Sequence, residues 1–203
     1  MTSNIIQAFK YWFKATVSPG KVINEFQLNQ HKLAISFWIV FIFAVLYSIT
    51  AFLIYIVQRP PAITPWIPVA EDQYYLYQTF WTIPWGLATW IMISGICHLL
   101  AVLGKKDLHK YKFENALVVC SLAWVIPSFY LMWIPETFLF APFGIEAPFE
   151  IEMLRLMIIP PIWQTLLTAI GIRQTHKVGL VKGVGVGFIT VVASFIMFFA
   201  FMR

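Results

Sequence analysis

Cys97, His98 and Cys120 are residues of metal-binding type that lie inside apolar stretches of the sequence. Cys97 and His98 are neighbours, and neighbouring residues on a helix point about 100° apart, so one metal ion would need local distortion to bind both. His98 lies six residues before Gly104 and Cys120 lies six residues after Glu114, so His98 and Cys120 sit at matching depths if these stretches form adjacent helices. A histidine hydrogen-bonded between helices explains the same residues, and we expect no metal site.

Ser121 and Gln164 are the other strong hydrogen-bonding residues deep inside apolar stretches. Together with His98 they could line a polar path across a membrane, as in a small transporter or channel. Hydrogen bonds between helices explain these residues without a substrate. The sequence contains no serine nucleophile elbow, zinc-protease helix or phosphate-binding Walker loop, so we expect no enzyme activity and no cofactor.

Long apolar stretches carry all of these residues. Of the 203 residues, 60% are hydrophobic and 11% are charged, whereas about 25% of the residues of a soluble globular protein are charged. Five stretches reach the length that a helix needs to cross a bilayer core of roughly 30 Å. They cover approximately residues 33–57, 80–104, 114–134, 152–172 and 180–202. We therefore predict an all-α, polytopic membrane bundle of five transmembrane helices within residues 33–203.

The amino-terminal part, residues 1–32, is amphipathic rather than continuously apolar. Residues 4–17 predict a helix with Lys10 and Lys14 on one face, a pattern typical of a helix that lies in the membrane interface. The opposite, apolar face consists of Ile5, Ile6, Phe9, Trp12, Phe13 and Thr16. Ser18 and Pro19 then match the N-cap and first turn of a second short helix.

The basic residues are distributed unevenly between the two sides of the predicted membrane. If the amino end is cytoplasmic, eleven of the fourteen Lys and Arg residues lie on the cytoplasmic side: Lys10, Lys14, Lys21, Lys32, Lys105, Lys106, Lys110, Lys112, Arg173, Lys177 and Lys182. Basic loops stay in the cytoplasm, so we predict a multi-pass protein with a cytoplasmic amino end and an extracytoplasmic carboxyl end. The net charge of +5 then reflects topology and contact with anionic lipid, and we expect no nucleic-acid partner.

Two surfaces could mediate association. The candidate docking surface on the cytoplasmic side comprises Lys10, Lys14, Lys105, Lys106, Lys110, Lys112, Arg173 and Lys177, which would attract anionic lipid or a protein partner. Gly179, Gly183 and Gly187 recur every four residues and form a smooth stripe on one face of the last helix. Such a stripe permits close helix packing, either within the bundle or in self-association.

Three segments resemble the Yip-one domain family, multipass membrane proteins that interact with Ypt and Rab GTPases, and in particular its prokaryotic branch. They are Ser18-Pro19 before the first span, the stretch from His98 to Ser128, and the stretch from Pro161 to Gly187. The resemblance covers most of the chain and implies five spans with a cytoplasmic amino end, in a prokaryotic cell membrane. Eukaryotic members are adaptors that bind prenylated small GTPases and one another. No DLYGP-like motif lies near the first span, so no GTPase-binding residue can be assigned.

These observations favour an integral membrane scaffold or adaptor that docks a protein partner or anionic lipid at its basic cytoplasmic face. One alternative is a small transporter or channel with a polar path near His98, Ser121 and Gln164. Another is an intramembrane metal-binding protein that uses Cys97, His98 and Cys120.

Overall fold

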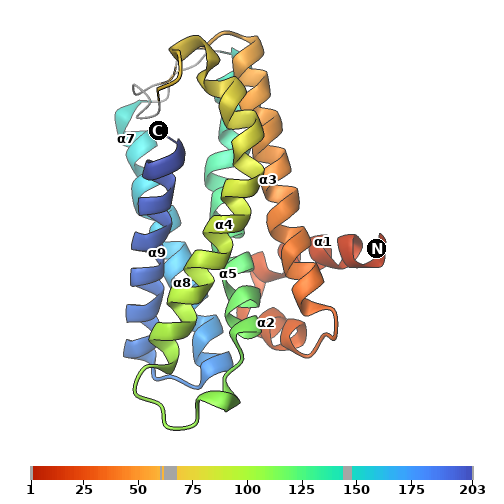
Figure 1. Ribbon diagram of the computed structural model, residues 1–203, viewed down its shortest axis with the longest axis vertical. Coiled ribbons are helices and arrows are strands. Elements are labelled where there is room, and N and C mark those ends of the chain that lie inside the picture. Colours follow the sequence, from red (N-terminus) through yellow and green to blue (C-terminus); the bar gives the residue numbers. More distant parts are fainter. Residues whose placement is uncertain (1, 60, 62–67, 144–147, 203) are drawn as a thin grey trace.

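The computed structural model describes residues 2–59, 61, 68–143 and 148–202, and the regular elements within these ranges are helical. Five helical segments are long and apolar enough to cross a membrane, and they run side by side (Figure 1). The segments are Lys32–Ile56, Glu71–Val102, Phe113–Phe140, Phe149–His176 and Leu180–Phe199. Their main α-helices are α3 (Lys32–Ile56), α4 (Tyr74–Val102), α5 (Phe113–Pro127), α8 (Ile159–His176) and α9 (Leu180–Met202). The predicted all-α bundle is confirmed.

The second span is longer than predicted. Its α-helix begins at Tyr74, directly after the 3-10 turn η1 (Glu71–Gln73), whereas the sequence predicts a start at residue 80. The residues in between include three tyrosines, and they continue the helix, with Tyr74 buried and Tyr77 47% exposed. Aromatic residues near a membrane interface therefore do not mark the end of a helix here.

Helix α5 forms the core of the bundle. Every residue from Val118 to Pro127 is buried, and the helix packs against α1, α2, α3, α4 and α8. A helix that is apolar on all sides is stable when protein surrounds it, and α5 has that composition. Helix α9 packs against α4 and α8.

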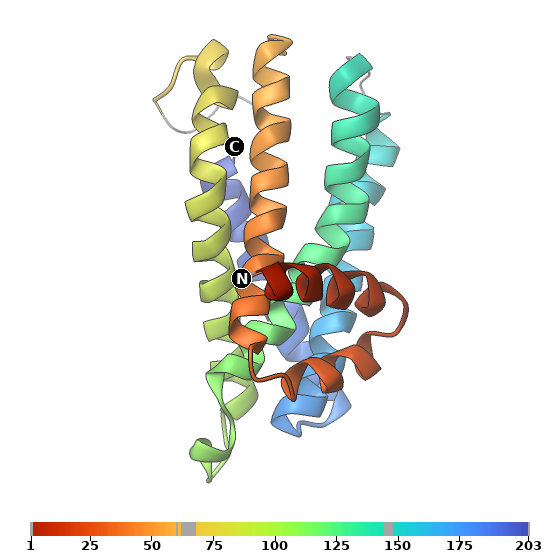
Figure 2. The ribbon, with the colours of Figure 1, turned by 90° about the vertical axis from the view of Figure 1, so that its right-hand side faces the viewer.

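Two short helices precede the first span, as predicted: α1 (Thr2–Val17) and α2 (Pro19–Gln27). Helix α1 crosses the side of the bundle almost at right angles to the spanning helices (Figure 2). The predicted apolar face is shared between the bundle and the surroundings. Trp12 is buried against Phe43 and Phe129 of the bundle, whereas Phe9 and Phe13 are 40% and 52% exposed. The helix is apolar over more than half its circumference, so one stripe packs on protein and another faces outward.

The third and fourth spans contain π-helical turns, which the sequence did not predict. They are η3 (Ser128–Trp133) and η4 (Glu136–Phe140) in the third span, and η5 (Met153–Ile158) in the fourth. Short helices α6 (Ala141–Phe143) and α7 (Phe149–Glu152) lie beside them. Pro127 directly precedes η3, and Pro160 and Pro161 directly follow η5 in the first turn of α8. Proline cannot donate a backbone hydrogen bond, and wider turns accommodate the disrupted ladder.

Candidate functional site

One end of the bundle carries the α4–α5 loop, residues 103–112, and the α8–α9 turn, residues 177–179 (Figure 1, bottom). We call it the basic end. Its loop also contains the 3-10 turn η2 (Leu108–Lys110). The exposed basic side chains of this end are Lys106, Lys110, Lys112, Arg173 and Lys177, and Lys182 is half-buried. Lys10 and Lys14 are exposed on α1, and Lys14 lies 3.9 Å from Glu25.

Lys105 differs from the other lysines of the α4–α5 loop because it holds the loop against a helix end. Its Nζ donates to the carbonyl oxygen of His176 at 2.5 Å and to that of Lys177 at 3.3 Å, and it lies 4.0 Å from the centre of the Tyr111 ring. Helix α8 ends at His176, and Lys177, which caps it, has a left-handed backbone (φ 50°). The last carbonyls of a helix lack partners within it, and they attract cations. Lys105 therefore has a structural role.

Lys182 makes a similar contact at this end, from α9 to the residue that follows α4. From the first turn of α9, its Nζ donates to the carbonyl oxygen of Leu103 at 2.6 Å. Lys110 instead pairs with Asp107 of its own loop at 2.6 Å. Lys105 and Lys182 thus join the ends of three spans, which gives the exposed lysines of the loop a fixed support.

A pair of histidines lies just inside the basic end. Nδ1 of His98 is 3.0 Å from Nε2 of His176, and the hydroxyl of Thr175 is 2.7 Å from Nδ1 of His176. His176 is fully buried, and the Tyr111 ring stacks on it. The prediction that His98 is hydrogen-bonded between helices is confirmed. The sequence does not identify His176 as this partner, because His176 lies next to the basic residues of the α8–α9 turn. Both histidines nevertheless lie at span ends on the same side.

The two cysteines meet inside the bundle. Cys97 and Cys120 are free, buried and within side-chain hydrogen-bonding contact of each other. This contact agrees with the matching depths predicted for His98 and Cys120, but the residue that contacts Cys120 is Cys97, the neighbour of His98. Among the described residues, no group of three or more His, Cys, Asp or Glu side chains is arranged to hold a metal ion.

The three residues of the predicted polar path have separate partners in the described part of the chain. His98 contacts His176, the Ser121 hydroxyl donates to the Val118 carbonyl of its own helix at 2.8 Å, and Gln164 donates to the Ser194 hydroxyl at 2.9 Å. The bond between Gln164 and Ser194 joins α8 to α9. Such bonding between helices is the alternative to a polar path given above. A polar path stays a prediction.

The glycine stripe packs mainly inside the bundle. A Cβ atom on Gly187 would lie 2.6 Å from the Thr165 carbonyl oxygen of α8, and one on Gly183 would lie 3.3 Å from the Ala169 carbonyl oxygen. A Cβ atom on Gly179 would have no packing neighbour within 4 Å. The sequence left two roles open for the stripe, packing within the bundle or self-association. Gly183 and Gly187 pack within the bundle, where they let α9 approach α8.

A network of charged side chains joins three spans at the end opposite the basic end. Arg155 is 8% exposed, and it lies 2.6 Å from Glu152 and 3.4 Å from Glu136. Glu136 is also 3.5 Å from Arg59, which follows the first span. A guanidinium nitrogen of Arg155 donates to the carbonyl oxygen of Met132 in η3 at 3.4 Å. Charges inside apolar segments are stable when they are paired, as these are.

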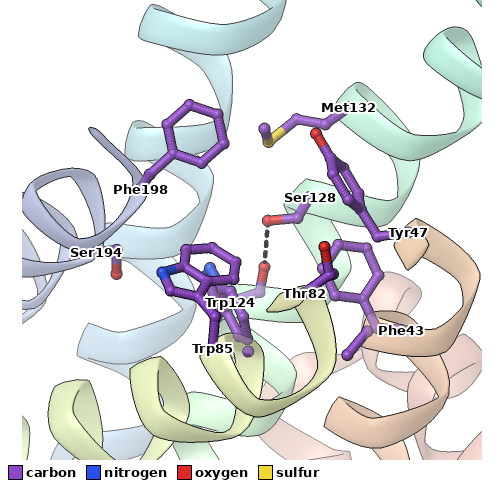
Figure 3. A pocket seen from close by; sticks show the side chains of 11 residues that line it. Phe43, Tyr47, Thr82, Trp85, Trp124, Ser128, Met132, Ser194 and Phe198 are labelled. Atoms are coloured by element: carbon purple, nitrogen blue, oxygen red, sulfur yellow. Dashed lines mark hydrogen bonds between the residues drawn. The ribbon is translucent and has the colours of Figure 1, made fainter. Parts of the chain in front are cut away.

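A cavity opens between the helices on the inner side of this network. Its walls come from α3, α4, η3, α9 and the end of α5 (Figure 3), and it is partly open to the surroundings. Five aromatic rings line it: Phe43, Tyr47, Trp85, Trp124 and Phe198. Sequence reasoning missed the cavity because aromatic residues on an apolar span look the same whether they face lipid, protein or an internal space.

Comparison with known proteins finds no family model, curated protein or solved structure that matches the chain.

Proposed function

We propose that the protein is a non-enzymatic integral membrane scaffold or adaptor, with the basic end in the cytoplasm as its docking surface for an anionic partner. One observation carries the proposal: the lysines of the α4–α5 loop have two different roles. Lys105 is tied to the end of α8, whereas Lys106, Lys110 and Lys112 are exposed. A loop anchored at its base and charged at its surface is suited to binding rather than only to packing.

Helix α1 supports the same proposal. Its exposed apolar residues, Ile6 and Val17 among them, adjoin the exposed Lys10 and Lys14. This combination is typical of a helix in the membrane interface, where lysines reach anionic headgroups. The resemblance to the Yip-one family, whose eukaryotic members are adaptors, agrees with this function. A transport path through His98, Ser121 and Gln164 and an intramembrane metal site remain alternatives that no contact described above favours.

The experiment is crosslinking in native membranes with a variant in which Lys106, Lys110 and Lys112 are replaced by glutamate. Lys105 is kept, because its loss would release the loop from α8. Each lysine near an anionic surface strengthens binding by about 1 kcal/mol, so removing three should weaken partner binding by roughly a hundredfold. Mass spectrometry of the crosslinked and co-purified material identifies the partner as protein or lipid.

The matched control neutralises three exposed acidic residues outside the basic end, with Glu71→Gln, Asp72→Asn and Glu150→Gln. It should keep every partner of the wild type. Loss of a protein partner in the lysine variant alone supports an adaptor, and loss of anionic lipid alone supports a lipid-docking scaffold. The proposal fails if the lysine variant is folded, correctly oriented and still binds all partners of the wild type.

A further inference from the structure

The aromatic cavity has walls that support one another. The Trp124 ring meets the Phe43 ring edge-on at 5.8 Å between centroids, and it meets the Trp85 ring at 6.0 Å. The indole nitrogen of Trp85 donates to the Met197 carbonyl oxygen of α9 at 3.2 Å, which fixes that ring. Rings held in this way from three helices cannot easily turn inward to fill the space.

Three hydroxyl groups in the walls are already hydrogen-bonded to the backbone. Thr82 donates to the Gln78 carbonyl at 2.6 Å, Ser128 donates to the Trp124 carbonyl at 2.8 Å (Figure 3, dashed line), and Ser194 donates to the Thr190 carbonyl at 3.0 Å. No charged side chain is among the described lining residues. A polar ligand would lose its hydration on entry and find few groups to replace it. The walls therefore select an apolar ligand.

The position of the cavity identifies the source of that ligand. All of its lining residues belong to segments that are apolar and long enough to cross a membrane. The pocket is partly open rather than enclosed, so a flexible apolar group can enter it from the side of the bundle. Inside a bilayer, the apolar group present at by far the highest concentration is the acyl chain of a phospholipid.

We propose that this partly open pocket is a specific binding site for the end of one acyl chain of a membrane phospholipid. The π-helical turn η3 forms part of the wall through Ser128 and Met132, so the change in helix geometry after Pro127 shapes the site. π-Helical turns occur frequently at binding sites. This site is separate from the docking surface at the basic end.

The test uses the full chain in phosphatidylcholine vesicles that contain a phospholipid with a photoactivatable diazirine on its acyl chain. After illumination, mass spectrometry maps the labelled peptides. Labelling of peptides containing Met132 or Phe198 should saturate as the fraction of probe rises, because a site holds one chain. Labelling of the outward-facing Ile189, which is 46% exposed, should rise in proportion to the probe. Labelling at Met132 and Phe198 that rises in the same proportion would overturn the proposal.

Variants provide a second, independent readout. Ser128→Phe places a ring in the cavity and should lower labelling at Met132 and Phe198 by roughly tenfold, because an overfilled site excludes the chain. Ile189→Phe adds a ring on the outward face of α9 and should leave that labelling unchanged. Ser128→Ala removes the hydroxyl without filling the space and should also leave it unchanged. Equal labelling of wild type and folded Ser128→Phe would contradict the site, and if Ser128→Phe does not fold, saturation in the wild type decides.

Discussion

Replacing Arg155 by methionine is expected to lower the free energy of unfolding by about 2 kcal/mol, because it removes the main partner of two carboxylates whose side chains are only 25% and 32% exposed. Arg155 is 8% exposed and bonds both Glu152 and Glu136. Without it, Glu152 loses its ion pair and Glu136 keeps only Arg59, at 3.5 Å. The measurement is equilibrium unfolding of the purified protein in mixed micelles, with wild type alongside.

The double variant Arg155→Met, Glu152→Gln tests the cause of this loss. If the loss comes from an uncompensated carboxylate, neutralising Glu152 should recover part of the stability. Arg155→Lys should fall in between, because a lysine keeps the charge but cannot reach both carboxylates and the Met132 carbonyl with the same geometry. An Arg155→Met variant as stable as wild type would show that the network contributes nothing to the fold.

The second large effect is expected at the α8–α9 contact. Gly187→Ala puts a Cβ atom 2.6 Å from the Thr165 carbonyl oxygen, so α9 must move away from α8. Forced overpacking of this kind costs about 1–3 kcal/mol, and the thermal unfolding midpoint should fall accordingly. Separation of the helices would also strain the hydrogen bond between Gln164 and Ser194.

Gly185→Ala is the matched control two residues away. A Cβ atom at Gly185 has nothing within 4 Å. Alanine is a better helix former than glycine by about 0.8–1 kcal/mol, so this variant should be as stable as the wild type or more stable. Equal destabilisation by both substitutions would mean that glycine flexibility, rather than close packing on α8, explains the stripe.

Local patterns were sufficient to predict the five spans and the two amino-terminal helices of this fold. The spans follow from apolar length, and α2 follows from Ser18-Pro19. The matching depths of His98 and Cys120 follow from counting residues back from a short loop, and Cys97, the neighbour of His98, contacts Cys120. Each of these inferences uses distances along one helix or across one hairpin, where helix geometry fixes the answer.

Contacts between helices that are distant in sequence could not be predicted. His98 and His176 meet because α8 ends beside α4, and nothing near either residue specifies that arrangement. Likewise Lys105 and Lys106 are neighbours of the same type, yet Lys105 contacts the end of α8 and Lys106 is exposed. Only part of the charged network could be predicted. Arg155 and Glu152 are one turn apart in the same span, whereas Glu136 comes from another span and meets Arg155 only in the folded bundle.

The orientation of the protein in its membrane is the most direct test of the proposed docking function, because the basic end must face the cytoplasm. We would replace the buried Cys97 and Cys120 with alanine and introduce one exposed cysteine at a time, by Lys106→Cys at the basic end or Glu150→Cys at the opposite end. A membrane-impermeant maleimide added to intact spheroplasts should label the protein carrying Glu150→Cys. It should label the protein carrying Lys106→Cys only after the membrane is opened. Labelling of Lys106→Cys from outside, with Glu150→Cys protected, would place the basic end outside the cell and contradict the proposal.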